Sequence, residues 1–255
     1  MHDEEIRKVA ELEATHWWYR ARRAVLTRQL SALTPDGGPA IDVGSCAGGH
    51  LPLLHRHGWR PLAVEYSDLG VRLIHEQGWP VLRGDIRRLP FADGTVSLAV
   101  AMDVLEHIDD DRLALRELFR VLRPGGTLLM SVPQDMRLWS AHDVALSHFR
   151  RYDRAELRVL LEAAGFAVER LWSWNVLLRP VAALRRRHGS KGGTDMERMP
   201  WLVNTGLRAI AGAERLLPVG RLPGLSLMLR AQRPPTASVV TPAAQRSRQR
   251  TYTGR

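Results

Sequence analysis

Short apolar runs and amphipathic stretches alternate from residue 40 to residue 165. The run at 96–102 is apolar at nearly every position, which is typical of a strand buried on both faces by helices. The stretch at 111–122 places leucine and phenylalanine at the spacing of one helix face. Repeated βαβ units predict a parallel, doubly wound sheet. The runs that predict its first five strands are 40–44, 61–66, 81–82, 96–102 and 127–132.

Residues at the ends of the predicted helices support these boundaries. Ser67 or Asp68 is placed to cap a helix that Gly78 ends. A capping box at 153–156 opens a later helix. The run Pro-Gly-Gly at 124–126 predicts a turn into the fifth strand.

Segments on either side of this core complete the organisation. Residues 4–30 predict one N-terminal helix, and two late apolar runs, 167–174 and 225–231, predict further strands. The roughly fifty residues between those strands are too many for a hairpin loop, so a helical insertion is predicted. The expected division is an N-terminal helical lid at 1–33, a core at 34–175 completed by a last strand at 225–233, the insertion at 176–224, and a disordered basic tail at 234–255.

The composition is that of a globular protein, with 45% hydrophobic and 25% charged residues. The net charge of +10 is unevenly placed: residues 1–175 hold 22 basic and 24 acidic residues, whereas 176–255 hold 15 and 3. The nearly neutral core lacks a surface for tracking phosphates, so nucleic acid is not the expected partner. Arginines at 185–187 beside an apolar stripe indicate either a solvated helix face or peripheral membrane contact through residues 176–224.

Two further features limit location and metal chemistry. No signal peptide opens the sequence, and no apolar run approaches the roughly 18 residues of a membrane span, which predicts a cytoplasmic protein. The single cysteine, Cys46, excludes an intramolecular disulfide and a multi-cysteine zinc site, and no metal is expected.

A glycine-rich turn at 44–49 follows the first predicted strand and lets backbone pass close to a ligand. Glu65 lies 21 positions after Gly44, at the tip of the second strand, where a carboxylate accepts hydrogen bonds from the ribose of a nucleoside cofactor. Asp85, at the tip of the third strand, is placed to accept from an adenine amino group. An ordinary exposed acid and a turn-forming aspartate are the alternatives for these two residues.

Position 46 affects which nucleoside cofactor is expected. The dinucleotide fingerprint Gly-x-Gly-x-x-Gly would fall on residues 44, 46 and 49, but residue 46 is cysteine. Pyrophosphate needs the close approach that glycine allows, whereas a cofactor without phosphates does not. The sequence therefore favours an adenosyl sulfonium over NAD. Cys46 is interpreted as a small buried residue rather than a nucleophile, because no neighbouring base supports that chemistry.

Five motifs occur in order over residues 40–132: 41–48 (IDVGSCAG), Glu65, 84–86 (GDI) with 89–91 (LPF), 102–108 (MDVLEHI) and 120–126 (RVLRPGG). Together they resemble the class I S-adenosylmethionine-dependent methyltransferases. The flanking runs 16–19 (HWWY) and 148–152 (HFRRY) are similar to a bacterial small-molecule branch that includes relatives of ubiquinone-biosynthesis O-methyltransferases. The resemblance implies a Rossmann-like seven-stranded sheet with an antiparallel last strand. It also implies S-adenosylmethionine as cofactor and S-adenosylhomocysteine as product.

The same resemblance implies roles for individual residues. The loop 42–48 holds the cofactor, Glu65 binds the ribose, Asp85 and Ile86 lie at the adenine, and Met102 lies near the methionine moiety. Two further interpretations come from the residues themselves: His107, just past the fourth predicted strand, covers the cofactor or caps the next helix, and the aromatic run near residue 18 is either core packing or a lid. The predicted cofactor-binding residues are Asp42, Gly44, Ser45, Cys46, Gly48, Glu65, Tyr66, Asp85, Ile86, Met102, His107, Trp18 and Tyr19.

Methyl transfer from a sulfonium is an in-line displacement, which requires mainly that the acceptor atom be positioned and water excluded. A general base is needed only when the acceptor starts protonated. His142, Asp143 and His148 follow the fifth strand at the cofactor end of the sheet and are the candidate bases. A solvated turn at 142–143 and a structural role for His148, bracing Arg151 or Tyr152, are the alternatives.

These observations predict methyl transfer to an oxygen or nitrogen atom of a small molecule, in a biosynthetic pathway. A nucleic-acid methyltransferase is a second hypothesis, although residues 103–106 (DVLE) stand where base-amino methyltransferases resemble one another in an Asn/Asp-Pro-Pro-aromatic run. A third is a non-catalytic scaffold that binds the cofactor and attaches to membranes or partners through its basic C-terminal third.

Overall fold

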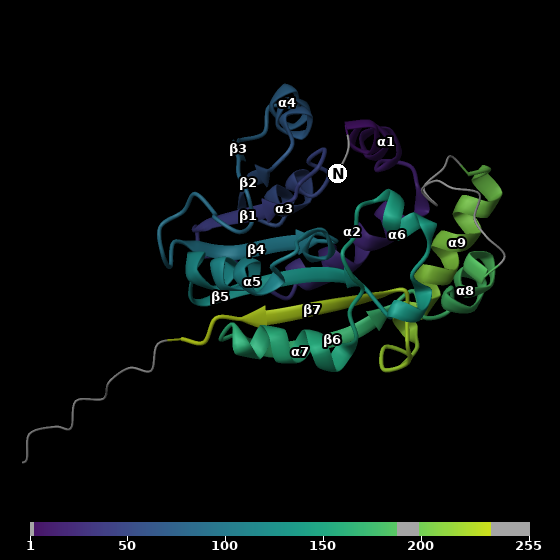
Figure 1. The fold of residues 1–255 in the computed structure, drawn as a ribbon. Coiled ribbons are helices and arrows are strands. Elements are labelled where there is room, and N and C mark those ends of the chain that lie inside the picture. Colours follow the sequence, from purple (N-terminus) through teal and green to yellow (C-terminus); the bar gives the residue numbers. More distant parts are fainter. Residues whose placement is uncertain (1–2, 188–198, 236–255) are drawn as a thin grey trace, which may run out of the picture.

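The computed structural model describes residues 3–187 and 199–235, and its centre is a seven-stranded sheet (Figure 1). The strand order is β3-β2-β1-β4-β5-β7-β6, in which β1 to β5 run parallel and β7 is antiparallel to both neighbours. The predicted fold class is therefore confirmed. The strands are β1 (Pro39–Val43), β2 (Arg60–Glu65), β3 (Val81–Arg83), β4 (Val96–Met102), β5 (Leu122–Pro133), β6 (Ala167–Trp174) and β7 (Ser226–Gln232).

Helices flank the sheet and extend beyond the carboxyl ends of its parallel strands (Figure 1). The α-helices are α1 (Asp3–Leu12), α2 (Trp17–Leu30), α3 (Leu51–Arg56), α4 (Asp68–Glu76), α5 (Asp111–Val121), α6 (Ala141–Ala145), α7 (Arg154–Ala163), α8 (Arg179–Arg187) and α9 (Trp201–Ala213). Three short 3-10 turns are η1 (Leu105–His107), η2 (Met136–Leu138) and η3 (Glu214–Leu216).

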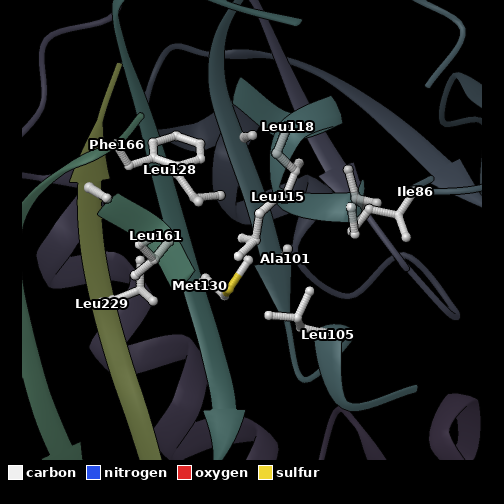
Figure 2. Close-up of a cluster of buried hydrophobic side chains, with 14 of the residues drawn as sticks. Ile86, Ala101, Leu105, Leu115, Leu118, Leu128, Met130, Leu161, Phe166 and Leu229 are labelled. Carbon is white, nitrogen blue, oxygen red and sulfur yellow. The ribbon is translucent and has the colours of Figure 1, made fainter. Parts of the chain in front are cut away.

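Alternate side chains of β4 pack into two different cores. Ala101 belongs to a cluster closed by α5 and α7, which includes Leu115 and Met130 (Figure 2). Leu98 and Val100 belong to a second cluster, closed by α2 and α3. All seven residues of β4 are buried, as its continuous apolar run predicts. Burying each large aliphatic side chain contributes roughly 1.5–3 kcal/mol, so packing on both faces fixes the tip of β4.

The single N-terminal helix predicted over residues 4–30 is wrong, because two helices form there. α1 ends at Leu12, and α2 begins at Trp17 after His16, whose ring accepts a hydrogen bond from the Trp18 N–H. A side chain that bonds the backbone in this way satisfies a donor at the start of a new helix. The break lets α1 contact α4 instead of continuing along α2.

The predicted turn at 124–126 lies inside a strand, which corrects the expected start of the fifth strand at residue 127. β5 already begins at Leu122, which pairs with Val96, and the register then shifts before Leu98. The Gly125 N–H donates to the Arg233 carbonyl at 2.8 Å. Glycine tolerates the φ of +78° at this position, so residues that usually signal a turn form an irregularity within the strand.

The insertion between β6 and β7 contains the two described helices α8 and α9, as predicted. Residues 188–198 of the insertion and 236–255 of the predicted basic tail lie outside the described residues. None of the described helices has the length and apolar character needed to cross a membrane.

Candidate functional site

Two cavities meet at the carboxyl ends of the central strands. The strand-tip cavity, of about 340 Å³, lies around the ends of β2 and β3. The lid cavity, of about 270 Å³, lies between the glycine-rich turn, the two N-terminal helices and α8. Gly44, Cys46, Asp103 and His107 line both cavities. This edge of an open parallel sheet is where ligands of such folds bind.

The glycine-rich turn bends sharply where the two cavities meet. Gly44, Cys46 and Gly48 all have positive φ, at +67°, +53° and +86°. At Gly44 a Cβ atom would lie 2.6 Å from Cγ2 of Val104, so a side chain has no space there. Cys46 adopts a conformation that favours glycine, and burial raises the pKa of its thiol. A high thiol pKa agrees with the prediction that Cys46 is not a nucleophile.

Replacing Gly44 by alanine is expected to cost more stability than the same change at Gly37. Both residues have positive φ, but a Cβ at Gly37 would meet nothing within 4 Å. Gly37→Ala should cost about 1–2 kcal/mol of unfolding free energy for the left-handed backbone. Gly44→Ala should cost roughly 1–3 kcal/mol more for the overlap with Val104. Denaturant titration measures both losses. Adding Val104→Ala to Gly44→Ala should recover the part of the loss that comes from the overlap. Equal losses at the two glycines would contradict the steric explanation.

Asp42 holds the turn from beneath. It is almost fully buried and accepts a hydrogen bond from the Ser45 hydroxyl at 2.5 Å, while its other oxygen lies 3.2 Å from Nδ1 of His50. Neither cavity has Asp42 among its lining residues, whereas Ser45 and His50 line the lid cavity. Asp42 thus supports the conformation of the turn from outside both cavities.

Glu65 lines the strand-tip cavity at the end of β2. Its two carboxylate oxygens accept hydrogen bonds from the backbone N–H groups of Cys46 (2.8 Å) and Ser67 (2.9 Å). Burial raises the pKa of this carboxyl group, and the amide donors oppose that rise. Since each carboxylate oxygen can accept two hydrogen bonds, the carboxylate retains acceptor capacity toward the cavity.

Asp85 lines the same cavity but already has a cationic partner. The Arg87 guanidinium binds both carboxylate oxygens, at 2.7 Å for the shortest contact, and the Arg87 backbone N–H donates to Oδ1 at 2.8 Å. These bonds hold the pKa of Asp85 below its ordinary value. A ligand amino group would therefore share this carboxylate with Arg87.

Apolar side chains complete the strand-tip cavity. Ile86 is buried and lines the cavity. Phe149, from the segment after α6, lines it too, although the sequence analysis did not assign this residue to the site. Tyr66 also lines the cavity, although 67% of its surface is exposed. Apolar walls with carboxylates at the edges fit a purine nucleoside, whose flat base needs apolar contact and whose amino and hydroxyl groups need acceptors.

An ion pair that the sequence analysis missed joins the N-terminal helices to the sheet. Asp103, at the tip of β4, accepts hydrogen bonds from Arg22 of α2 at 2.5 Å and from the Ser131 hydroxyl at 2.7 Å. Its φ of +57° lies in the left-handed region, which residues other than glycine seldom adopt. An acid at the tip of a strand was available as a signal, as it was for Glu65, but the partner of Asp103 lies 81 residues away in the sequence.

A partly buried cluster of titratable groups lies on the wall of the lid cavity. Glu106 is 1% exposed, its Oε2 has no hydrogen-bond partner among the described residues, and burial raises its pKa well above the ordinary value. Burial lowers the pKa of His107 to about 4, and its ring lies 4.7 Å from that of His148. Ligand atoms of these three residues lie within 4.8 Å of one another, so the cluster could hold a metal ion. The sequence analysis did not single out Glu106.

The candidate bases occupy different environments. His142 and His148 line the lid cavity. Asp143 is fully buried, with Oδ1 lying 2.7 Å from the Arg151 guanidinium and 3.0 Å from Nδ1 of His148. Although burial raises the pKa of Asp143, His148 and Arg151 lower it more, to well below the ordinary range. Asp143 is therefore placed to orient its neighbours rather than to contact a ligand.

The aromatic run of α2 serves the core and the lid cavity together. Trp17, Trp18 and Tyr19 all line the lid cavity. Trp17 is also part of the core. Trp18 packs against the same core, with its ring centre 4.8 Å from that of Trp174. Met102, at the tip of β4, is buried on another wall of the same cavity.

Comparison with known proteins agrees with this arrangement. Residues 41–130 match the family model of a methyltransferase domain. The chain is 30% identical over 168 residues to a "Probable S-adenosylmethionine-dependent methyltransferase" of Mycolicibacterium smegmatis, covering 64% of each protein. It is 27% identical over 165 residues to a protein so named from Mycobacterium tuberculosis, covering 63% of this chain and 59% of that one. The chain thus spans less than two thirds of the length of these curated relatives.

Solved structures share the fold. The methyltransferase bound to the Trm112 activator of Haloferax volcanii matches with a TM-score of 0.63 and 21% identity, over 92% of this chain and 96% of that one. An S-adenosylmethionine-dependent methyltransferase from Mesorhizobium loti matches with a TM-score of 0.56 and 18% identity, over 81% and 96%. The matched domain at 41–130 and the curated relatives support a class I S-adenosylmethionine-dependent methyltransferase, and the strand order is that of the same Rossmann-like fold.

Proposed function

We propose that this protein transfers a methyl group to an oxygen or nitrogen atom of a small biosynthetic molecule. The observation that supports the proposal is the pair of cavities joined at Gly44, Cys46, Asp103 and His107. One cavity offers the groups that a nucleoside needs, and the other offers an apolar space lined by titratable groups. S-adenosylmethionine, when bound, supplies the methyl group on a positively charged sulfur.

Residues of the strand-tip cavity bind the adenosine part in this proposal. Glu65 accepts from the ribose hydroxyls, and Asp85 accepts from the adenine amino group while keeping its pair with Arg87. Ile86 and Phe149 contact the faces of the base. Backbone N–H groups already hold the Glu65 and Asp85 carboxylates in place. Ordering these side chains therefore costs little free energy when the ligand binds.

Residues of the lid cavity bind the acceptor and keep water away from it. α1 contributes Val9, α2 contributes Trp17 and Trp18, and β4 contributes Met102 to the wall. Excluding water and fixing the acceptor atom is the main requirement of a displacement reaction. The aromatic and aliphatic side chains of this wall also favour an acceptor with an apolar body.

His148 is the residue we assign to proton removal. Asp143 binds its Nδ1, which leaves Nε2 to accept a proton from an acceptor hydroxyl or amine. The neighbouring His107 has a low pKa and stays neutral at physiological pH, so it adds no charge that would oppose protonation of His148.

Replacing His148 by alanine is expected to lower turnover about a hundredfold, since general-base catalysis contributes at least this factor. Affinity for S-adenosylhomocysteine should stay the same. His142→Ala provides the comparison, because His142 lines the same cavity from α6. If His142→Ala lost more turnover than His148→Ala, the general base would be His142 instead.

The activity itself is tested by S-adenosylhomocysteine release from S-adenosylmethionine, with fractionated cell extract as the pool of acceptors. Release that depends on both the protein and an extract fraction is the expected result. Tight binding of the cofactor without release in any fraction would contradict methyl transfer and support the non-catalytic scaffold.

A further inference from the structure

Large apolar side chains of α9 and of the segment after it are exposed to solvent. Exposed fractions there run from 40% at Ile210 to 87% at Leu216. An apolar surface of this extent on one segment marks an interaction site more often than chance exposure does. We call it the insertion face; it consists of Trp201, Leu202, Val203, Ile210, Leu216, Leu217 and Leu222.

α9 is fixed to the protein by its inner side. Ala211 is buried against the α2 side of the core, and Leu207 packs there as well. The Asn204 side chain accepts from the Trp17 N–H at 2.7 Å and donates to the Thr15 carbonyl at 3.0 Å. The helix therefore has a defined orientation, and its apolar outer face is a property of the folded protein.

The exposed charges on this segment are of one sign. Arg208, Arg215 and Arg221 are exposed. Glu214, the single acid among residues 199–224, is buried and accepts a hydrogen bond from the Leu177 N–H at 3.0 Å. A second copy of the chain docked through this face would bring arginines toward arginines. An anionic surface complements the face instead.

We propose that the insertion face docks on an anionic phospholipid bilayer. An interfacial helix of this kind places tryptophan and leucine at the boundary of headgroups and acyl chains, with arginines reaching the lipid phosphates. Trp201 and Leu202 occupy the apolar positions, and Arg208 occupies a flanking cationic one. Since no described helix can cross a membrane, the contact is peripheral.

The insertion also forms a wall of the lid cavity. Val181, Ala182 and Arg185 of α8, together with Leu207 of α9, line it. Figure 1 shows α8 and α9 beyond the carboxyl ends of the strands, on the side where α6 also lies. Docking through the insertion face therefore places the acceptor side of the molecule at the bilayer. This points to an acceptor with an apolar body held in the membrane, a step that rests on the proposed methyl transfer.

Flotation of the full chain with phospholipid vesicles tests the docking. Binding is expected with vesicles of phosphatidylcholine containing about 30% phosphatidylglycerol and to be much weaker with phosphatidylcholine alone. The triple change Trp201→Ser, Leu202→Ser and Leu216→Ser keeps every arginine, including those of residues 236–255. It should weaken binding by about tenfold or more, because three large apolar side chains no longer leave water.

A charge variant and a surface control complete the test. Changing Arg208, Arg215 and Arg221 to Gln should weaken binding about fivefold for each arginine and make it less sensitive to salt. Val159→Ser removes an equally exposed apolar side chain from α7 and should leave vesicle binding unchanged. Thermal unfolding checks that all variants fold.

Two results would overturn the docking proposal: no binding to anionic vesicles, or binding that the triple serine change leaves intact. If the protein formed a concentration-dependent dimer that the same change abolished, the insertion face would bind a second copy of the chain instead of a bilayer. The acceptor step fails separately, if vesicle-borne extract lipids give no more S-adenosylhomocysteine release than water-soluble fractions do. Absence of any release, with docking intact, would contradict the proposed function and leave the membrane contact standing.

Discussion

Replacing Glu65 by alanine is expected to abolish useful binding of S-adenosylhomocysteine, with a loss of affinity of about two to four orders of magnitude. A hydrogen bond to a charged acceptor contributes roughly 1.5–3 kcal/mol, and the proposal gives this carboxylate two such bonds to the ribose. The change also leaves the Cys46 and Ser67 N–H groups without their acceptor, so the turn loses support. Isothermal titration calorimetry measures the loss directly.

Two further variants make this result interpretable. Glu65→Gln keeps the shape but places an NH₂ group against one of two backbone donors, so it should lose nearly as much affinity as alanine. Glu76→Gln, at the exposed end of α4, should leave affinity unchanged. Unaltered affinity in Glu65→Ala would remove the strand-tip cavity as the cofactor site.

Asp143→Ala is expected to lower the free energy of unfolding by about 3–5 kcal/mol, since removing one partner leaves a buried cation uncompensated. Arg151 has only 2% of its side chain exposed and has Asp143 at 2.7 Å. The loss of stability should appear in denaturant titration whether or not the cofactor is present. This loss of stability should be larger than that caused by replacing a residue that contacts only the acceptor.

An exposed ion pair supplies the control for Asp143. Arg158 and Glu162 are four residues apart on α7, 3.4 Å from each other, and about half exposed. Glu162→Ala should cost less than about 0.5 kcal/mol, because solvent and salt screen such pairs. If Asp143→Ala cost as little as this, the buried pair would not hold the segment after β5 in place, and the assignment of Asp143 as a positioning residue would be wrong.

The central strands could be predicted from sequence because burial on both faces leaves a continuous apolar run, as at 96–102. The N-terminal break could not, because the stretch through His16 keeps a helical pattern and the interruption depends on one ring accepting the Trp18 N–H. The Pro-Gly-Gly run at 124–126 misled for a different reason. Its turn residues sit where β5 must shift register against β4, and pairing with the segment beyond β7 decides their conformation.

The same distinction applies to the site. Glu65 and Asp85 could be assigned to this edge because each stands at the tip of a strand, and strand tips of a parallel sheet share one edge. The pairing of Asp85 with Arg87, and of Asp103 with Arg22, was not evident because geometry rather than residue type selects the partner. Glu106 was missed because a buried acid looks identical in sequence to an exposed one.

The break between α1 and α2 bears on how ligands enter and leave. α2 is held by Arg22 at Asp103 and by Asn204 at its first turn, whereas α1 contributes Ile6 to one cavity and Val9 to the other. If α1 moved away about a hinge at residues 13–16, the strand-tip cavity and the lid cavity would open together. Spent cofactor and methylated product would then depart in the same opening event, and the rate of that opening would set the ceiling on turnover.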